Sequence, residues 1–186
     1  MTTNNLIEFP FLNYDIKTAK SIQVDTYTFK LYSIGERGTQ ISSNLLSEVV
    51  TGLINKIVSC YGKEFDSIVT IQTSGAMWSM PIALWANKPL YIFTTESNGT
   101  EGIQQQRPYQ PRLIYAPNLS DVGKCIIIDD VISGGGTIKQ LKEIIEKQGG
   151  EVLGAFCVID KHGKAKALSK ELGTHVCALI TDLDTK

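Results

Sequence analysis

The segment from Ile126 to Thr137, with the sequence IIIDDVISGGGT, combines the residue types needed to hold a phosphorylated sugar. An apolar run leads into two adjacent acids, Asp129 and Asp130, and then into three glycines before Thr137. Because glycines lack a Cβ, the backbone can turn tightly and present successive N–H groups to a phosphate at the positive end of a helix. The two carboxylates repel phosphate but suit the vicinal hydroxyls of a sugar or a bound Mg²⁺. The pattern therefore predicts a sugar phosphate site with a metal ion nearby.

Two other functions of glycine-rich loops do not fit this segment. A P-loop needs a GK[ST] sequence, and here the last glycine, Gly136, is followed directly by Thr137. In a dinucleotide-binding fold the acid follows the glycines by about 20 residues, whereas both acids precede them here. Neither an ATPase nor a dehydrogenase fits, and the remaining alternative is a strand that ends in solvated acids before a flexible turn.

The segment closely resembles the phosphoribosyl-diphosphate-binding motif of the type I phosphoribosyltransferases, in which an apolar strand and two acids precede a loop of Ser or Thr and Gly. The resemblance extends from about Leu31 to Leu183 and is nearest to the purine enzymes of the adenine and hypoxanthine kind. It implies a single α/β domain over residues 1–186, Rossmann-like, with a central mainly parallel sheet flanked by helices and a small hood. It also implies a Mg²⁺-dependent enzyme of nucleotide salvage that transfers ribose 5-phosphate from phosphoribosyl diphosphate (PRPP) to a purine base, giving a nucleotide and pyrophosphate.

The same resemblance implies residue roles. Asp129 and Asp130 would be catalytic and hold the ribose hydroxyls, while Mg²⁺ would bind mainly through the ligand with one of these carboxylates nearby. The 5-phosphate would lie along the loop that follows, made of Val131, Ile132, Ser133, Gly134, Gly135, Gly136 and Thr137. The pyrophosphate would lie on the loop after the strand SIVTI, made of Thr73, Ser74 and Gly75, where an ordinary strand-to-helix turn is the alternative.

A long segment from about 94 to 112 carries Asn, Gly, Gln and Pro without an apolar period, at the place where the family has a flexible loop that closes over the reacting centre. Arg107 is expected to be catalytic there, with Tyr109 and Arg112 as further contacts, and solvated charges are the alternative. Family members usually carry Arg or Lys just after the strand that reads PLYIF here, whereas this chain has Thr94 to Glu96. The sequence leaves open what replaces that cation.

Base recognition is expected from a hood built by residues 27–41, residues 160–166 or both. The two segments are polar, and Lys161 or His162 could hydrogen-bond a purine oxygen or nitrogen; solvated side chains after a strand are the alternative. One branch of the family has a carboxylate in place of Ser133 that acts as base toward the purine, which a serine cannot do. The proton acceptor and the identity of the base therefore stay open.

The elements that must position these residues alternate between strand and helix from Ser67 onward, which predicts a parallel sheet covered by helices. Ligands of such sheets bind beyond the carboxyl ends of the strands, where Thr73, Glu96 and Asp129 all fall. Strands are expected at 27–32, 67–71, 89–93, 113–115, 124–130, 152–159 and 175–180. Helices are expected from Ser42 or Ser43 to Gly62, after Gly75, from Thr137 to Gly149, and from Lys164 to Leu172.

Composition and charge exclude several other classes of protein. With 42% hydrophobic and 20% charged residues among 186, the chain can bury a core, which argues against disorder and a coiled coil. Its net charge of −1 gives no general attraction to nucleic acid or an anionic membrane. The sequence has no signal peptide pattern and no long apolar run, so we expect a cytoplasmic protein. The four cysteines, Cys60, Cys125, Cys157 and Cys177, are expected to be reduced rather than to bind zinc.

The resemblance also implies a homodimer. The alternative function is a non-catalytic regulator of the same fold that senses PRPP or a nucleotide, and the absence of a cation at Thr94 to Glu96 favours it. The lack of an added DNA-binding domain and of a general positive charge favours the enzyme.

Overall fold

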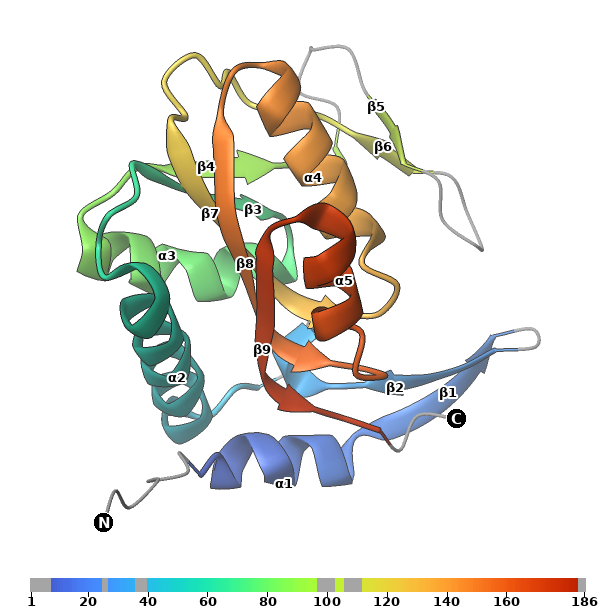
Figure 1. Cartoon of the computed structure of the whole chain (residues 1–186). Coiled ribbons are helices and arrows are strands. Elements are labelled where there is room, and N and C mark those ends of the chain that lie inside the picture. The colour runs from blue at the N-terminus through green and yellow to red at the C-terminus, as the bar shows by residue number, and fades with distance from the viewer. Residues whose placement is uncertain (1–7, 25–26, 36–39, 97–102, 106–111, 184–186) are drawn as a thin grey trace.

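The computed structural model describes residues 8–24, 27–35, 40–96, 103–105 and 112–183 (Figure 1). Its centre is a five-stranded parallel sheet with the strand order β4-β3-β7-β8-β9. The strands are β3 (Ser67–Ile71), β4 (Leu90–Phe93), β7 (Lys124–Ile132), β8 (Glu151–Asp160) and β9 (His175–Thr181). The expected α/β class with a parallel central sheet is confirmed.

Helices cover both faces of this sheet (Figure 1). α2 (Ser43–Tyr61) and α3 (Ser74–Ala86) pack on one face, and α4 (Gly136–Lys147) and α5 (Ala165–Leu172) pack on the other. The Ser42 hydroxyl accepts the Leu45 N–H at 3.2 Å and caps α2, as the sequence predicts. In the part of the chain that the structure describes, no helix is both long and apolar enough to cross a membrane.

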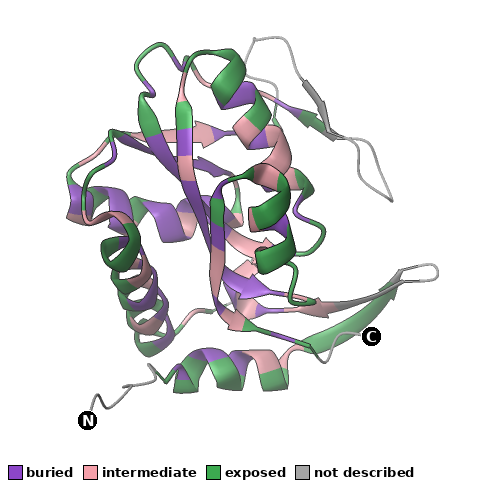
Figure 2. Ribbon diagram, viewed as in Figure 1, coloured by how far each residue is buried: buried purple, intermediate pink, exposed green. Residues whose placement is uncertain are grey.

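β7 is buried from both sides, which explains its unbroken apolar run. Ile126 and Ile128 belong to the core under α2 and α3, whereas Cys125 and Ile127 belong to the core under α4. Figure 2 shows that the buried segments concentrate in the middle of the molecule, on β7 and β8 and the inner sides of the helices. The central strand that carries the two acids is therefore held rigidly by packing on both faces.

The chain changes direction across the sheet between β3 and β7. From β3 it passes through α3 to β4 on one side, and from β7 it passes through α4 to β8 on the other side. The β3–β7 pairing ends at Val69 and Ile127, after which Thr70 Oγ1 donates to the Ile128 carbonyl oxygen at 2.8 Å. Open α/β sheets bind ligands in the crevice at such a switch point, beyond the carboxyl ends of the strands.

The N-terminal elements include a helix and a strand that we did not expect. α1 (Pro10–Thr18) is followed by a hairpin of β1 (Lys20–Val24) and β2 (Tyr27–Leu31), and then by the 3-10 turn η1 (Ser33–Gly35). Glu48 of α2 accepts the N–H groups of Phe11 and Leu12 at 3.1 and 2.7 Å, so a long-range contact caps α1. The hairpin lies beside the end of the sheet where β8 and β9 finish (Figure 1).

Several element boundaries differ from the expectation. The strand that carries the acids was expected to end at Asp130, but β7 continues to Ile132 because Val131 and Ile132 pair with β8. α4 begins at Gly136 with Gly135 as its N-cap, so the prediction that Thr137 opens this helix was wrong by one residue. β5 (Ile103–Gln105) lies within the segment expected as a loop and pairs antiparallel with β6 (Arg112–Ile114), which overlaps the strand expected at 113–115.

Candidate functional site

The two acids of β7 lie in different surroundings. Asp129 is only 6% exposed, and its Oδ1 accepts the backbone N–H of Asp130 at 3.0 Å. Asp130 is half-buried, and its carboxylate lies against η1, where a Cβ added to Gly35 would be 2.8 Å from Asp130 Oδ2. Asp130 is therefore the more accessible of the two acids, while Asp129 supports the backbone that carries it.

The start of α3 lies directly beside the acids. Gly75 is buried, and a Cβ at this position would lie 2.4 Å from Thr70 Oγ1 and 3.3 Å from Asp129 Oδ1. Contacts this short leave room only for glycine. The preceding Gln72–Thr73 peptide bond is cis, and Thr73 is exposed at the end of β3. The strand-to-helix turn thus brings its backbone next to Asp129.

Two hydrogen bonds hold η1 on the start of α3. The Ser74 hydroxyl donates to the Gly35 carbonyl oxygen at 2.9 Å, and Trp78 Nε1 donates to the Ile34 carbonyl oxygen at 3.1 Å. They fix Gly35 next to the Asp130 carboxylate. The sequence placed Ile34 and Gly35 in the expected hood, and nothing in it predicted their contact with α3 and Asp130.

Two helix N-termini flank the acids. α3 begins after β3 and α4 begins after β7, and β3 and β7 are neighbours in the sheet. Within the two described helices, neither first turn contains an acidic residue. The N–H groups of a first turn and the helix dipole attract anions. The arrangement therefore suits a ligand with two phosphate groups and hydroxyls between them.

The three glycines before α4 differ in their structural roles. Gly135 has φ +75°, and a Cβ there would lie 2.7 Å from Leu168 Cδ2 of α5. At Gly134 and Gly136 an added Cβ would meet no atom within 4 Å. Gly135 is thus required by the fold, whereas the other two glycines leave their backbone open to a ligand.

The turn after β8 lies next to the end of β7. Asp160 is 2% exposed and accepts the N–H groups of Lys164 and Ala165 at 2.8 Å each, so it caps α5. The Lys161 N–H donates to the Ile132 carbonyl oxygen at 2.9 Å. This bond places the Lys161 backbone beside Ile132, which is two residues beyond Asp130. His162 is exposed and has φ 148°.

Lys161 also contacts β2. Its Nζ lies 4.8 Å from the centre of the Tyr32 ring and 3.5 Å from the Lys30 carbonyl oxygen. Below it, Asp182 Oδ2 accepts from Lys30 Nζ at 2.9 Å and from the Tyr32 hydroxyl at 2.8 Å. Burial and then the Asp182 carboxylate raise the pKa of Tyr32 far above its usual value, so the phenol stays protonated and donates.

The structure brings most of the expected site residues to one end of the sheet. Asp129 and Asp130 lie between the turn at Thr73 to Gly75 and the loop at Ser133 to Thr137, and Lys161 and His162 follow the neighbouring strand. The side chains of Val131 and Ile132 pack into the two cores, so a ligand could meet only their backbone.

The structure gives no side-chain position for the cationic residues expected to act from the 94–112 segment. Arg107 and Tyr109 lie outside the described residues, and Arg112 is described through its backbone in β6. Thr94, where the family usually has a cation, accepts hydrogen bonds from the Gln72 amide and the Glu96 N–H and pairs with Tyr115. The Thr94 hydroxyl therefore links the residue after β4 to Gln72, the residue after β3.

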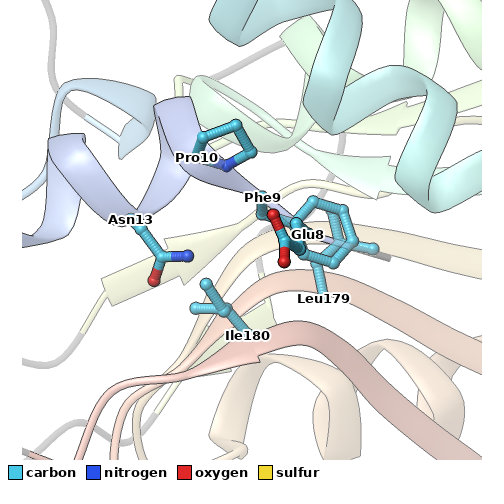
Figure 3. Close-up of a pocket in the computed structure, with 6 residues that line it drawn as sticks. All are labelled: Glu8, Phe9, Pro10, Asn13, Leu179 and Ile180. Carbon is cyan, nitrogen blue, oxygen red and sulfur yellow. The ribbon is translucent and has the colours of Figure 1, made fainter. Parts of the chain in front are cut away.

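A pocket of about 440 Å³ lies between the start of α1 and β9, away from the acid pair (Figure 3). Its lining includes the carboxylate of Glu8 and the amide of Asn13, with no cationic side chain. The remaining lining residues are Phe9, Pro10, Leu179 and Ile180. Such a lining does not supply the donors that a sugar phosphate needs, so the crevice between β3 and β7 is the better candidate.

Comparisons with known proteins identify the family of the chain. The family model of the phosphoribosyl transferase domain matches residues 39–175, which include both loops and both acids. A hypoxanthine/guanine phosphoribosyltransferase of Methanocaldococcus infernus is 27% identical over 172 residues, covering 91% of this chain and 92% of that protein. An HGPRTase-like protein of Halomicrobium mukohataei is also 27% identical, covering 91% of this chain and 89% of that protein. Adenine phosphoribosyltransferase of Saccharomyces cerevisiae shares the fold, with a TM-score of 0.72 at 15% identity over 92% of this chain and 97% of that one.

Proposed function

Because the chain belongs to the phosphoribosyl transferase domain family, as a type I member nearest the purine enzymes, we propose that it transfers ribose 5-phosphate from PRPP to a purine base. The observation that carries the proposal is the switch-point crevice, in which two helix N-termini flank Asp129 and Asp130. PRPP has a 5-phosphate at one end, a 1-diphosphate at the other and two ribose hydroxyls between them. The proposed binding elements come in the same order: the glycine loop before α4 for the 5-phosphate, the two acids for the hydroxyls, and the start of α3 for the diphosphate.

In this proposal the protein acts by positioning and by charge. The bond from the anomeric carbon to pyrophosphate breaks as the base nitrogen attacks from the opposite face, through a state that resembles an oxocarbenium ion. The backbone N–H groups at Ser74 and Gly75 hold the departing pyrophosphate, and those from Gly134 to Thr137 hold the 5-phosphate. The Asp130 carboxylate accepts hydrogen bonds from the ribose hydroxyls and stabilises the positive charge that develops on the ring.

The donor set also fits Mg²⁺ held mainly by the ligand. Among the described residues, no group of three or more His, Cys, Asp and Glu side chains could hold a metal ion. Mg²⁺ needs oxygen ligands, keeps several waters and is often bound by one or two carboxylates together with substrate phosphates. Asp130, or Asp129, would supply the carboxylate, and the bound metal would stabilise the charge of the leaving pyrophosphate.

Lys161 favours an oxopurine as the acceptor base. A lysine ammonium has donors and no acceptor, so it pairs with a carbonyl oxygen such as O6 of hypoxanthine or guanine, and not with the amino group of adenine. Lys161 directly follows β8, and its backbone N–H donates to the Ile132 carbonyl oxygen at the end of β7, two residues beyond Asp130. The names of the relatives from Methanocaldococcus infernus and Halomicrobium mukohataei support the same choice.

Replacing this lysine should reduce base recognition without affecting PRPP binding. Lys161→Met is expected to lower kcat/KM for an oxopurine roughly 10- to 100-fold, the loss expected for a hydrogen bond from a charged donor. The KM for PRPP should change little. The matched control is Lys164→Met, because the Lys164 side chain is exposed after the same turn. Equal losses in both variants would contradict the role of Lys161 and indicate a general charge effect.

The glycine loop gives a test that separates binding from folding. Gly134→Ala should leave the melting temperature unchanged but raise the KM for PRPP about ten-fold, which is about 1.4 kcal/mol, because the methyl group occupies the space that the phosphate approaches. Gly135→Ala should instead lower the free energy of unfolding by about 2 kcal/mol or more, since it combines φ +75° with overlap on Leu168. Thermal unfolding and PRPP titration of both variants measure this. An equally destabilised Gly134→Ala protein would contradict the assignment.

Two further properties belong to the proposal. A homodimer is supported by the outer face of α3, where Met80 and Leu84, one turn apart, are 54% and 84% exposed. The molar mass of the protein in solution tests whether it is a dimer.

A cytoplasmic location is supported by the phosphorylated substrate and the four free cysteines.

Formation of a nucleotide from PRPP, Mg²⁺ and one base at a time tests the function. Hypoxanthine, guanine, xanthine, adenine and orotate are offered separately, and products are separated by chromatography. We expect nucleotide with one or more oxopurines and little with adenine. Nucleotide from adenine alone would overturn the choice of base, and no nucleotide from any base would overturn the transferase.

A further inference from the structure

A cluster of sulfur and imidazole groups lies where α2 ends and β9 begins, at the opposite end of the sheet strands from the acid pair. Cys60 Sγ, in the last turn of α2, lies 3.5 Å from Nε2 of His175, the first residue of β9. Sγ also lies 3.9 Å from the Ser59 hydroxyl oxygen. Both Cys60 and His175 are exposed. Neither side chain has a role in the proposed transfer reaction.

A second thiol lies on the same side of β9. Cys177 is two residues beyond His175, and alternate residues of a strand point to the same face. Its side chain packs, partly buried, against the core under α2. Cys177 therefore lies on the face of β9 that α2 covers, near enough to Cys60 for that thiol to act on its pKa, and His175 lies beside the exposed Cys60.

The end of α2 is fixed against β8 and β9 by Tyr61. The Tyr61 hydroxyl donates to the Leu153 carbonyl oxygen at 2.6 Å. Its ring covers Gly154, where a Cβ would lie 3.0 Å from Tyr61 Cε2. The Phe156 ring, 6.1 Å from Tyr61 and 5.9 Å from His175 between ring centres, packs between them. These contacts set the position of Cys60 over β9.

The cysteines differ in their surroundings and therefore in their expected reactivity. Burial, followed by the neighbouring Cys60, raises the pKa of Cys177 to about 11, while the Lys56 ammonium acts in the opposite direction. Burial also raises the pKa of Cys125 to about 12 and that of Cys157 well above its usual value. A thiolate is the reactive form of cysteine, and the His175 ring nitrogen at 3.5 Å gives the exposed Cys60 thiol a hydrogen-bond partner. Cys60 is thus the cysteine whose position favours attack on an electrophile.

We propose that Cys60 is a modification site for hydrogen peroxide, at which Cys60 is oxidised first and Cys177 then forms a disulfide with it. In the first step the Cys60 thiolate attacks one peroxide oxygen, the O–O bond breaks, and the hydroxide that leaves takes up a proton as water. Sulfur is oxidised to the sulfenic acid and the peroxide is reduced. In the second step Cys177 sulfur attacks Cys60 sulfur, the S–O bond breaks, and the hydroxide leaves as water with the Cys177 proton. Overall, two thiols and one hydrogen peroxide give one disulfide and two waters.

Titration of the full chain with hydrogen peroxide, followed by intact mass and peptide mapping, tests the proposal. The wild-type protein should lose two hydrogen atoms and two free thiols, with a Cys60–Cys177 cross-link. Cys177→Ser should gain one oxygen atom at Cys60, which a sulfenic acid reagent traps. Cys60→Ser should keep its remaining thiols, and His175→Gln should oxidise on the order of ten-fold more slowly.

The conservative replacements keep the size of each side chain, and a melting curve on each variant confirms folding. Cys157→Ser provides the matched control, because this thiol is buried and should not change the rate. Oxidation of Cys60→Ser at the wild-type rate would overturn the proposal. So would a cross-link between any other pair, or a rate no higher than that of free cysteine.

Discussion

An Asp130→Asn protein is expected to stay folded while kcat/KM for pyrophosphate release falls on the order of 10²- to 10³-fold, the usual loss when one preorganised charged partner is removed. The side chains have nearly the same size, and Asp130 is half-buried, so the amide fits the same space beside Gly35. The amide lacks the charge that would stabilise a positive ribose ring. Steady-state rates and a thermal unfolding curve of the same preparation measure both parts of this prediction.

Two other acids serve as controls for Asp130. Asp129 is buried and its Oδ1 accepts a backbone N–H, so Asp129→Asn should lower stability as well as activity. Asp121 is an exposed acid just before the start of β7, at the opposite end of the strand from the acid pair, and Asp121→Asn should change neither quantity. Full activity in Asp130→Asn would remove this residue from the mechanism.

Gly75→Ala is expected to impair both folding and turnover. The new methyl group would overlap Thr70 Oγ1, which donates to the Ile128 carbonyl oxygen between β3 and β7, and would press on Asp129 Oδ1. Overpacking of this kind costs about 1–3 kcal/mol of unfolding free energy. A displacement of Asp129 shifts the backbone of Asp130, so kcat should fall as well. Denaturant unfolding and steady-state kinetics give the two numbers.

A double variant identifies the source of that loss. Thr70→Ala removes the atom that lies 2.4 Å from the added methyl group, so Thr70→Ala with Gly75→Ala should be more stable than the sum of the single effects predicts. The Asp129 contact at 3.3 Å remains in the double variant, so activity should recover less than stability. Additive losses in stability would contradict the steric account of Gly75.

Local sequence was sufficient for the strands of the central sheet, the acid pair and the glycine loop. The run from Ile126 to Ile128 is apolar because both of its faces are buried, and this pattern identified the central strand. Alternation of strand and helix from Ser67 onward identified the parallel sheet. Asp129 and Asp130 stood out because two acids at the end of an apolar strand, shortly before three glycines, have few uses other than binding.

Contacts between distant segments could not be predicted from the sequence. The extension of β7 beyond Asp130 depends on pairing with β8, and the cap of α1 comes from Glu48. The sequence assigned no separate role to Asp160, although it caps α5. The position of Gly35 against Asp130 depends on the hydrogen bond from Ser74. Each of these links joins residues whose spacing carries no local signal, so only the tertiary structure shows them.

The central claim is that the crevice between β3 and β7 catalyses transfer from PRPP to a base. The most direct test is release of pyrophosphate from PRPP and Mg²⁺, measured with and without hypoxanthine. The account predicts release that requires the base and is lost in Asp130→Asn. PRPP binding detected by calorimetry, with no pyrophosphate released for any base, would contradict it and indicate a sensor that lacks the cation after Phe93.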